Sequence, residues 1–577
     1  MWWWIMMALS ILQWNGRSLI ANGQELKYFV EKQHDKPNII CVQETWLKPS
    51  LDFRIFGYTA IRKDREAGAG GGVAMFIHQG LSYKSLCLNT EIEVIGTEVW
   101  AGDLKFEVVN FYNPCLKITR ELLGEICRQG SSRLILCGDF NAHNTLWGSS
   151  RTIDNGRVIE EFMDDCKLVC MNDGRGTRFD VLRGVESAID LTIVSEQVAG
   201  TTQWEVLKTS LESDHFPIWV KINSNNVHLE DYLHPRWNMR EANWGLYSMK
   251  ADVKFMGVLS HAGNDVEELN SVITNIICDT AEETIGKSTG NRQKKMVPWW
   301  TNECKEAVKA RNKAFKKIKS NHSFDNLIAY KQAQSKARRI IKDTKKKYWR
   351  DFCGTIGSHT KIEDVWGMIR KMGGIRRDFS LPVLKDSVCE AVTNVEKAEM
   401  LAAAFVKVHS SHNLSNGELE WRKQVIQGNV DLLGRKEVSD NALDKDFTLF
   451  ELKRALIGAK HTSPGKDGVC YKLIEQLCDM SKSVILKLYN MVWEQGQLPS
   501  SWKHSIIVPI PKPGKDKTEA KSYRPIALTS NLCKLMERML TKRLVHEIEK
   551  RGLLSPHQSG FRNGRTAMDP IGVGLPG

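Results

Sequence analysis

Several features that would assign this chain to a special class of protein are missing. None of its 14 cysteines forms a Cys-x-x-Cys pair, so a zinc ribbon or a disulfide framework is not indicated. Free thiols in a reducing intracellular compartment are expected instead. No apolar run approaches the roughly 20 residues that span a bilayer. The apolar opening at 1–7 is short and has no basic segment before it, so we expect neither a signal peptide nor a membrane partner.

Length and composition set broad limits. At 577 residues the chain is too long for one hydrophobic core, and several domains are expected. Hydrophobic residues make up 42% and charged residues 26%, which is typical of folded globular protein. The formal net charge of +13 points to a polyanionic partner without naming one.

The basic charge is concentrated in one segment. From Lys305 to Arg350 there are 16 Lys and Arg against three acids, an excess of 13 that equals the excess of the whole chain. Helical spacing predicts long helices over 299–349. We expect a track for nucleic-acid phosphates, with Phe315, Tyr330, Tyr348 and Trp349 available for stacking. The alternative is a solvated helix pair that joins domains. The patch residues are Lys316, Lys317, Arg338, Arg339, Lys345, Lys346 and Lys347.

The first 223 residues alternate short apolar strands with turns and a few helices. Strands are predicted at 9–14, 38–42, 73–77, 94–100, 106–111, 134–137, 189–194 and 218–222. Helical spacing appears at 23–33, 120–129 and 156–166. Many strands with interspersed helices indicate a two-sheet α/β sandwich.

Polar residues follow several of these strands directly. Asp139 and Asn141 come immediately after the apolar run at 134–137, in the string Gly-Asp-Phe-Asn-Ala-His. Similar junctions carry Glu44, Asp190 and the pair Asp214 and His215, and Asn15 follows the first strand. One acid at a strand end is ordinary, since an Asp can cap any turn. Several carboxylates, an imidazole and an amide at successive strand ends predict one assembled site.

These residue types suit the hydrolysis of a phosphodiester, which needs a metal, a base that aims water and a donor for the leaving oxygen. Hard oxygen ligands favour Mg²⁺, with Mn²⁺ as the alternative. Glu44 is the first metal ligand we expect, supported by Asn15 and Asp214. Asp139 would activate water and Asn141 would orient it or donate to the phosphate. Asp190 would hold the tautomer of His215 and raise its pKa, and Tyr112 would add a phenol donor.

In this order, the residues resemble the exonuclease III-like endonuclease/exonuclease/phosphatase family over 9–222. The resemblance implies the same roles for these positions and a four-layer α/β sandwich. The motif sequences Gln-Glu-Thr-Trp at 43–46 and Ser-Asp-His-Phe-Pro-Ile at 213–218 are similar to those of the family branch carried by non-LTR retrotransposons of the jockey type.

The last region, 447–577, contains Pro and Gly residues at intervals and shows no catalytic group by itself. It resembles the fingers of a non-LTR retrotransposon reverse transcriptase, through Ser-Pro-Gly-Lys-Asp-Gly at 463–468, 506–512, Tyr-Arg-Pro-Ile-Ala-Leu at 523–528 and Gln-Ser-Gly-Phe-Arg at 558–562. The resemblance implies that Lys512 and Arg524 meet the incoming triphosphate. The family's catalytic carboxylates do not follow Phe561. We therefore expect a truncated polymerase region without activity.

The predicted organisation has four parts: the endonuclease-like sandwich at 9–223, a helical connector at 224–296, a basic helical linker at 297–446 and the partial fingers at 447–577. The predicted function is Mg²⁺-dependent nicking of target DNA in the nucleus to prime reverse transcription. Element RNA would be a further partner in an intact relative, and no small-molecule cofactor beyond the metal is expected. A phosphatase of the same superfamily and a non-catalytic nucleic-acid-binding relic are the rivals.

Overall fold

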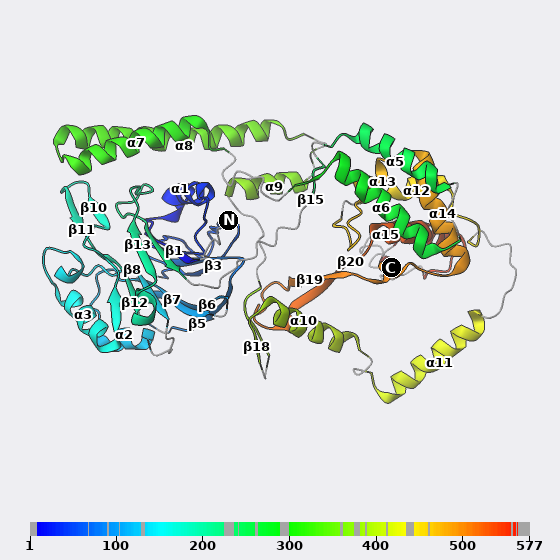
Figure 1. The fold of residues 1–577 in the computed structure, drawn as a ribbon, viewed down its shortest axis with the longest axis horizontal. Coiled ribbons are helices and arrows are strands. Elements are labelled where there is room, and N and C mark those ends of the chain that lie inside the picture. Colours follow the sequence, from blue (N-terminus) through cyan, green and yellow to red (C-terminus); the bar gives the residue numbers. More distant parts are fainter. Residues whose placement is uncertain are drawn as a thin grey trace, which may run out of the picture. The chain divides into compact units, whose positions relative to one another are not determined.

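The structure is a computed structural model (Figure 1). It describes residues 8–66, 68–88, 90, 92–102, 104–127, 133–223, 236–239, 242–259, 264–288, 299–357, 360, 362–373, 381–386, 389–410, 414–433, 443–459, 462–555, 558–560 and 562. The predictions for the apolar opening at 1–7 and for the residues from 563 onward lie outside this described part.

The chain forms two compact units. The first comprises Met1–Tyr232, Gln293–Met400 and Lys517–Ala520, and the second comprises Leu233–Arg292, Leu401–Asp516 and Lys521–Gly577. The domain boundaries at 223, 296 and 446 stay predictions, but the contacts assign most of the predicted connector to the second unit.

Two six-stranded sheets build the first unit (Figure 1). One sheet has the order β13-β14-β1-β2-β4-β3 and the other β5-β6-β7-β8-β12-β9. The strands of the first are β1 (Ala8–Asn15), β2 (Ile39–Gln43), β3 (Tyr58–Lys63), β4 (Val73–His78), β13 (Thr202–Val206) and β14 (Ile218–Asn223). Those of the second are β5 (Ser82–Leu86), β6 (Glu93–Ala101), β7 (Leu104–Tyr112), β8 (Leu134–Asp139), β9 (Leu168–Cys170) and β12 (Asp190–Ser195).

Helices cover the outer face of each sheet. Side chains of both sheets, such as Ile11 and Val108, meet in one buried core between them. A second core joins α1 (Leu19–Lys32) to the first sheet. A third joins α2 (Arg120–Cys127) and α3 (Asp154–Cys166) to the second sheet. This arrangement confirms the predicted four-layer α/β sandwich. The short α4 (Glu196–Ala199) and the hairpin β10 (Arg178–Asp180) and β11 (Val185–Ser187) complete it.

The basic segment forms two long helices, α7 (Asn302–Ser320) and α8 (Phe324–Gly354), which pack against each other in the first unit (Figure 1). Phe315 and Tyr330 are 5% exposed and form a cluster with Phe179 and Phe216. The stacking role predicted for Phe315 and Tyr330 is therefore wrong, because core packing removes both rings from solvent. The unit also contains α9 (Ile362–Gly373), β17 (Leu384–Lys385) and β18 (Glu390–Ala391).

Helices dominate the second unit. They are α5 (Trp244–Leu259), α6 (Val266–Thr284), α11 (Asn416–Leu433), α12 (Leu449–Leu456), α13 (Tyr471–Glu475), α14 (Asp479–Gln495) and α15 (Asn531–Lys550). α10 (Asn394–His409) crosses the boundary between the units. Two-stranded pairs are formed by β15 (Arg236–Trp237) with β16 (Lys287–Ser288) and by β19 (Ile506–Pro511) with β20 (Tyr523–Leu528).

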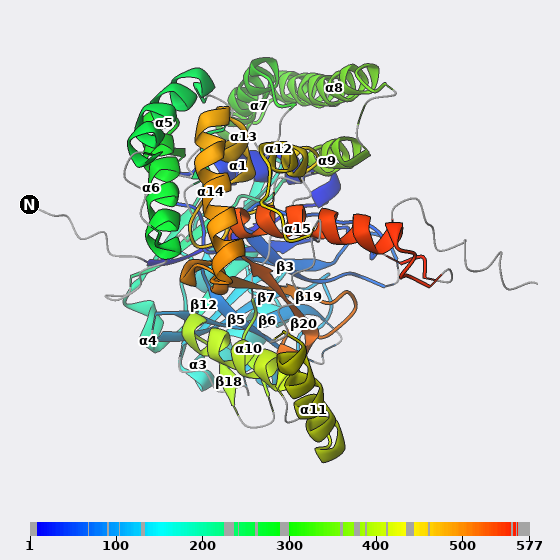
Figure 2. The same cartoon turned by 90° about the vertical axis from the view of Figure 1, so that its right-hand side faces the viewer.

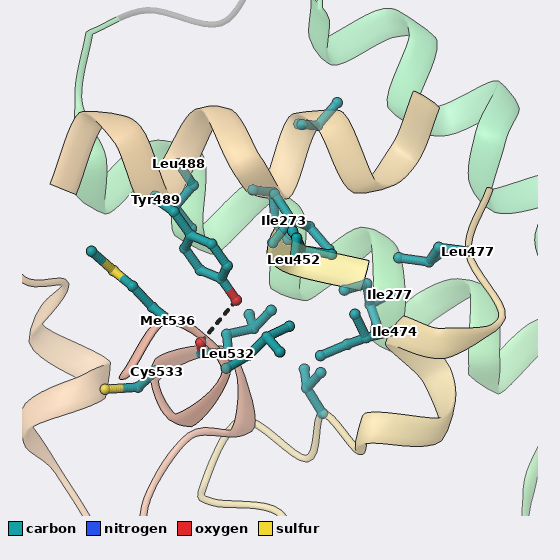
Figure 3. Close-up of a cluster of buried hydrophobic side chains, with 14 of the residues drawn as sticks. Ile273, Ile277, Leu452, Ile474, Leu477, Leu488, Tyr489, Leu532, Cys533 and Met536 are labelled. Carbon is teal, nitrogen blue, oxygen red and sulfur yellow. Dashed lines mark hydrogen bonds between the residues drawn. The ribbon is translucent and has the colours of Figure 1, made fainter. Parts of the chain in front are cut away.

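The predicted connector shares a core with the fingers-like region. α5 and α6 pack against α14, and Figure 2 shows the three helices side by side. Figure 3 shows Ile273 and Ile277 of α6 in the same cluster as Leu452 and Leu488. The hydroxyl of Tyr489 donates to the carbonyl oxygen of Leu532 at 2.8 Å (Figure 3), which ties α14 to α15.

Two helices follow each other closely in the second unit. α13 ends at Glu475 and α14 begins at Asp479. Leu477 between them is buried in the core, and Cys478 caps α14 by accepting from Ser481 N–H. The break therefore serves core packing. In the described part of the chain, every helix is too short or too polar to cross a membrane.

Candidate active site

Strand register brings three of the predicted side chains into one row. In the second sheet Tyr112 pairs with Asp139 on β7 and β8, and Asp139 pairs with Asp190 on β8 and β12. In the first sheet β1 and β2 run parallel and place Asn15 opposite Gln43, one residue before Glu44. The strands that carry these residues therefore end at one edge of the sandwich.

Gly138 permits the close approach of β8 to β7. A Cβ atom at this position would lie 1.8 Å from the carbonyl oxygen of Phe111, far inside any tolerable contact. The glycine in Gly-Asp-Phe-Asn is therefore explained by backbone packing, and it lets Asp139 reach the strand end.

Asn15 joins two carboxylates. It is fully buried, and its Nδ2 donates to Oε1 of Glu44 at 3.0 Å and to Oδ2 of Asp139 at 2.8 Å. Its Oδ1 accepts from Arg17 N–H at 3.2 Å. In this arrangement Asn15 holds Glu44 and Asp139 next to each other by its amide protons.

His215 lies between two acids. Its Nδ1 is 2.8 Å from Oδ2 of Asp190, and its Nε2 is 3.9 Å from Oδ2 of Asp139. The Asp190 carboxylate also accepts from the hydroxyl of Thr177 at 2.7 Å. Burial alone would lower the pKa of His215. The negative charges of the neighbouring carboxylates outweigh burial and raise the pKa to about 9, and Asp190 makes the largest of these contributions. The imidazole is therefore held protonated, with Nε2 toward Asp139.

Asp139 has a pKa above its ordinary value. Desolvation by burial is the main cause, and the charge of Asp190 adds to it, while His215 acts in the opposite direction. Asn141 N–H donates to Oδ1 of Asp139 at 3.1 Å, and the Asn141 amide donates to the carbonyl oxygen of Asn113 at 2.8 Å. A carboxylate with a raised pKa, within reach of a protonated imidazole, suits a group that takes a proton near neutral pH.

Asp214 is held by two cations. Arg17 lies 3.1 Å and Arg178 2.9 Å from its Oδ2. Burial would raise the pKa of Asp214, but His215 and the two guanidinium groups outweigh it and lower the pKa. Its Oδ1 is buried and has no hydrogen-bond partner among the described residues. An ionised oxygen without a partner is available to a cation.

Tyr112 interacts with Glu44. Burial raises the pKa of its phenol, and the negative charges of Glu44 and Asp139 and a hydrogen bond to Glu44 raise it further. The guanidinium of Arg65 lies 5.9 Å from the Tyr112 ring centre. The phenol therefore stays protonated and can donate.

The donor set fits a hard divalent cation. Glu44 is half-buried, and Asp214 supplies the unpaired buried oxygen. Ligand atoms of Asp139, Asp190 and His215 also lie within 4.8 Å of one another. That cluster suits proton handling better, because a protonated imidazole is no metal ligand. Glu44 and the unpaired oxygen of Asp214 are therefore the groups that remain available to a cation.

Sequence reasoning missed the residues that hold this set in place. They are Arg17, Arg178, Thr177 and Ser213, whose hydroxyl donates to the Asn15 carbonyl oxygen at 2.7 Å. Arg178 reaches the site because its strand bridges to His215. No spacing signal in the sequence identifies that bridge.

The other predicted binding residues lie elsewhere. In the second unit, β19 and β20 pair Ile510 with Arg524. Lys512 N–H donates to the carbonyl oxygen of Ser522, so Lys512 and Arg524 are diagonal neighbours on one face of the hairpin. In the first unit all seven residues of the basic patch are exposed, but Arg338 pairs with Glu212 at 2.5 Å.

A family described as endonuclease-reverse transcriptase matches residues 106–219. The probable RNA-directed DNA polymerase from transposon BS of Drosophila melanogaster is 23% identical over 98% of this chain and 62% of its own length. The RNA-directed DNA polymerase from mobile element jockey of the same organism is 20% identical over 96% of this chain. The chain's homologues are non-LTR retrotransposon polymerases. It spans less than two thirds of their length.

Solved structures match the first unit. The endonuclease domain of TRAS1, a telomere-specific non-LTR retrotransposon, is 22% identical, with a TM-score of 0.34, and covers 38% of this chain and all of that chain. AP endonuclease LMAP from Leishmania major is 16% identical, with a TM-score of 0.32, and covers 38% of this chain and 88% of that chain.

Proposed function

We propose that the first unit is a divalent-metal-dependent DNA endonuclease that nicks target DNA for a non-LTR retrotransposon. The observation that carries the proposal is the convergence of Asn15, Glu44, Asp139, Asp190 and His215, from five separate strand ends, within hydrogen-bonding or ion-pair distance of their neighbours. The retrotransposon homologues support nucleic acid as the substrate.

Each residue has a role in this mechanism. Glu44 and Asp214 would hold Mg²⁺, or Mn²⁺, which when bound neutralises phosphate charge. Asp139 takes the proton of the attacking water and Asn141 orients that water. His215 donates from Nε2 to the charge that develops on the phosphate, and Asp190 fixes its tautomer through Nδ1. Tyr112 adds a phenol donor.

The second unit is proposed to contribute polymerase-like structure. The face that carries Lys512 and Arg524 supports contact with a triphosphate. We also propose that these 577 residues alone do not polymerise, because Asp569 is the only acid after Phe561. In a longer relative, the nick would prime copying of element RNA at a chromosomal site in the nucleus.

The test separates endonuclease from phosphatase. The full chain is incubated with supercoiled plasmid in Mg²⁺, and relaxed product is measured in parallel with inorganic phosphate release from a 3′-phosphorylated oligonucleotide. Nicking without phosphate release supports the proposal. Phosphate release without nicking selects the phosphatase, and DNA binding without either activity selects the non-catalytic relic.

A further inference from the structure

A cleft lies between α7 and the loops that carry the catalytic residues. Its volume is about 460 Å³, within the range of pockets that hold small-molecule-sized groups. Phe216 and Phe315 line it, and their rings meet edge-on with centres 5.9 Å apart. Both rings are buried, so the apolar wall is fixed by packing against the sandwich.

The cleft is strongly cationic. Four cations, Arg175, Lys208, Lys316 and Lys319, line it against one carboxylate, Glu186. Lys319 pairs with Glu186 at 3.1 Å and lies 4.4 Å from the centre of the Phe216 ring.

Two of these cations are uncompensated. Lys208 and Lys316 are exposed, and no acidic partner is found for either among the described residues. Two lysines from separate elements, facing one cleft without a counter-charge, form a site for an anion with spaced negative charges.

The chain links this cleft closely to the catalytic groups. Phe216 directly follows His215, and Gly176 in the cleft wall directly precedes Thr177, which holds Asp190. Adjacent Cα atoms are about 3.8 Å apart, while phosphates along one DNA strand advance by about 3.4 Å each. The cleft therefore lies within a few nucleotides of a phosphate placed at His215.

We propose that the cleft is a backbone subsite for the target DNA strand, in which Lys208 and Lys316 bind phosphates next to the cleaved one. This inference rests on the proposed endonuclease function. Because contacts from lysine to phosphates carry no sequence information, the binding by Lys208 and Lys316 is independent of base sequence.

The test uses the full chain with Lys208→Ala and Lys316→Ala combined. The expected result is a tenfold or larger rise in KM for plasmid nicking with kcat unchanged. The slope of log Kd against log salt concentration should fall by about 2, because each lost phosphate contact lowers it by about 0.9. Lys36→Ala is the matched control. It removes an exposed charge before β2, at the strand end opposite Glu44, and should behave as wild type.

Binding to duplex DNA is measured separately in the presence of a chelator, so that the two proposals fail independently. If wild type nicks and the double variant matches it in KM and salt slope, the cleft proposal is overturned. If wild type does not nick but the double variant loses affinity and slope, the endonuclease proposal falls and the subsite stands.

A buried group of charged residues joins α7 to the sandwich. Arg311 of α7 is 1% exposed and donates to both carboxylate oxygens of Glu25 on α1, at 2.6 and 2.9 Å. It also lies 3.5 Å from Glu212, which pairs with Arg338 of α8. Two arginines and two glutamates thus connect both basic helices to the sandwich.

Glu212 belongs to the loop that presents the catalytic residues. Leu211 and Glu212 have φ angles of 49° and 71°, a left-handed conformation that side chains rarely adopt without support. Ser213, Asp214 and His215 follow directly. The buried ion pairs hold the strained end of this loop.

The structure assigns Arg311 as a positioning residue for His215, acting through Glu212. This role too rests on the proposed function. The test compares Glu212→Gln, which keeps the shape and removes the charge, with Arg311→Gln and with both together. Each single variant should lower kcat by about 10- to 100-fold with KM within twofold, and the double variant should lose no more than the worse single variant.

Folding is monitored by circular dichroism and thermal melting. Arg120→Ala is the control, because it breaks an exposed ion pair with Glu161 far from this loop in the sequence. Unchanged kcat in Glu212→Gln, or losses that multiply in the double variant, would overturn the assignment. Failure of wild type to nick would instead overturn the proposed function.

Discussion

The charge of Asp190 is expected to control the protonation of His215. Asp190→Asn keeps the size of the side chain but removes the charge that, more than any other, raises the pKa of His215 to about 9. Without it, burial is opposed only by the remaining charges of Asp139 and Asp214, so the pKa of His215 falls. A fall from about 9 to the ordinary value of about 6.5 would be the largest expected effect, and it corresponds to about 3 kcal/mol of lost interaction with the protonated form.

The effect of Asp190→Asn on stability depends on pH. Because the folded-state pKa of His215 is raised, its contribution to stability is complete below about pH 6.5 and disappears as pH rises through about 9. Asp190→Asn should therefore destabilise the first unit at pH 6 and have little effect on its stability above pH 9.

Activity should fall for the same reason. At pH 7.5 wild-type His215 is almost fully protonated, whereas an imidazole with a pKa near 6.5 is about one tenth protonated. Loss of the fixed tautomer adds to this, so kcat for plasmid nicking should fall by about 10²- to 10⁴-fold. The assays are nicking kinetics from pH 6 to 9 and an NMR titration of His215. A kcat within threefold of wild type, or an unchanged titration, would refute this account of His215.

Four other outcomes are expected. His215→Ala should lower nicking by 10²-fold or more while the variant keeps the circular dichroism spectrum of the folded chain, and near-normal turnover would remove His215 from the mechanism. Chelation should abolish nicking, and added Mg²⁺ or Mn²⁺ should restore it. Glu44→Gln should raise the metal concentration needed for nicking by about 10- to 100-fold. An unchanged metal requirement would argue against Glu44 as a ligand. Gly138→Ala should destabilise the first unit by about 3 kcal/mol in a thermal melt, since its Cβ meets the Phe111 carbonyl oxygen; a stable variant would contradict the packing argument. Removing Lys346 and Lys347 should lower the salt slope of DNA binding by about 2, and an unchanged slope would leave them as solvated surface.

The strands with buried apolar runs could be predicted from the sequence. β2 and β8 are buried at every position. Glu44 directly follows β2, and Asp139 is the last residue of β8, so the apolar pattern and the polar residues of the site indicated the same strand ends. The edge strands β5 and β13 were missed. Burial alternates along both strands, so a partly apolar sequence such as Thr202–Val206 is sufficient at these positions.

The sequence alone could not identify the charged residues that support the site. Arg311 lies within the most basic part of the chain, where every neighbour suggests solvent, yet it is buried against Glu25 from 286 residues away. The same holds for Phe315, which packs on Phe179 and Phe216. Cys304, Phe315 and Ile318 lie at helical spacing along α7, but the partners that cover this face depend on tertiary contacts.

The most direct test of the central claim is anomalous diffraction from crystals of the full chain soaked in Mn²⁺. The account predicts one strong peak about 2.0–2.3 Å from an oxygen of Glu44. Manganese bound only elsewhere, with nothing beside Glu44, would contradict it.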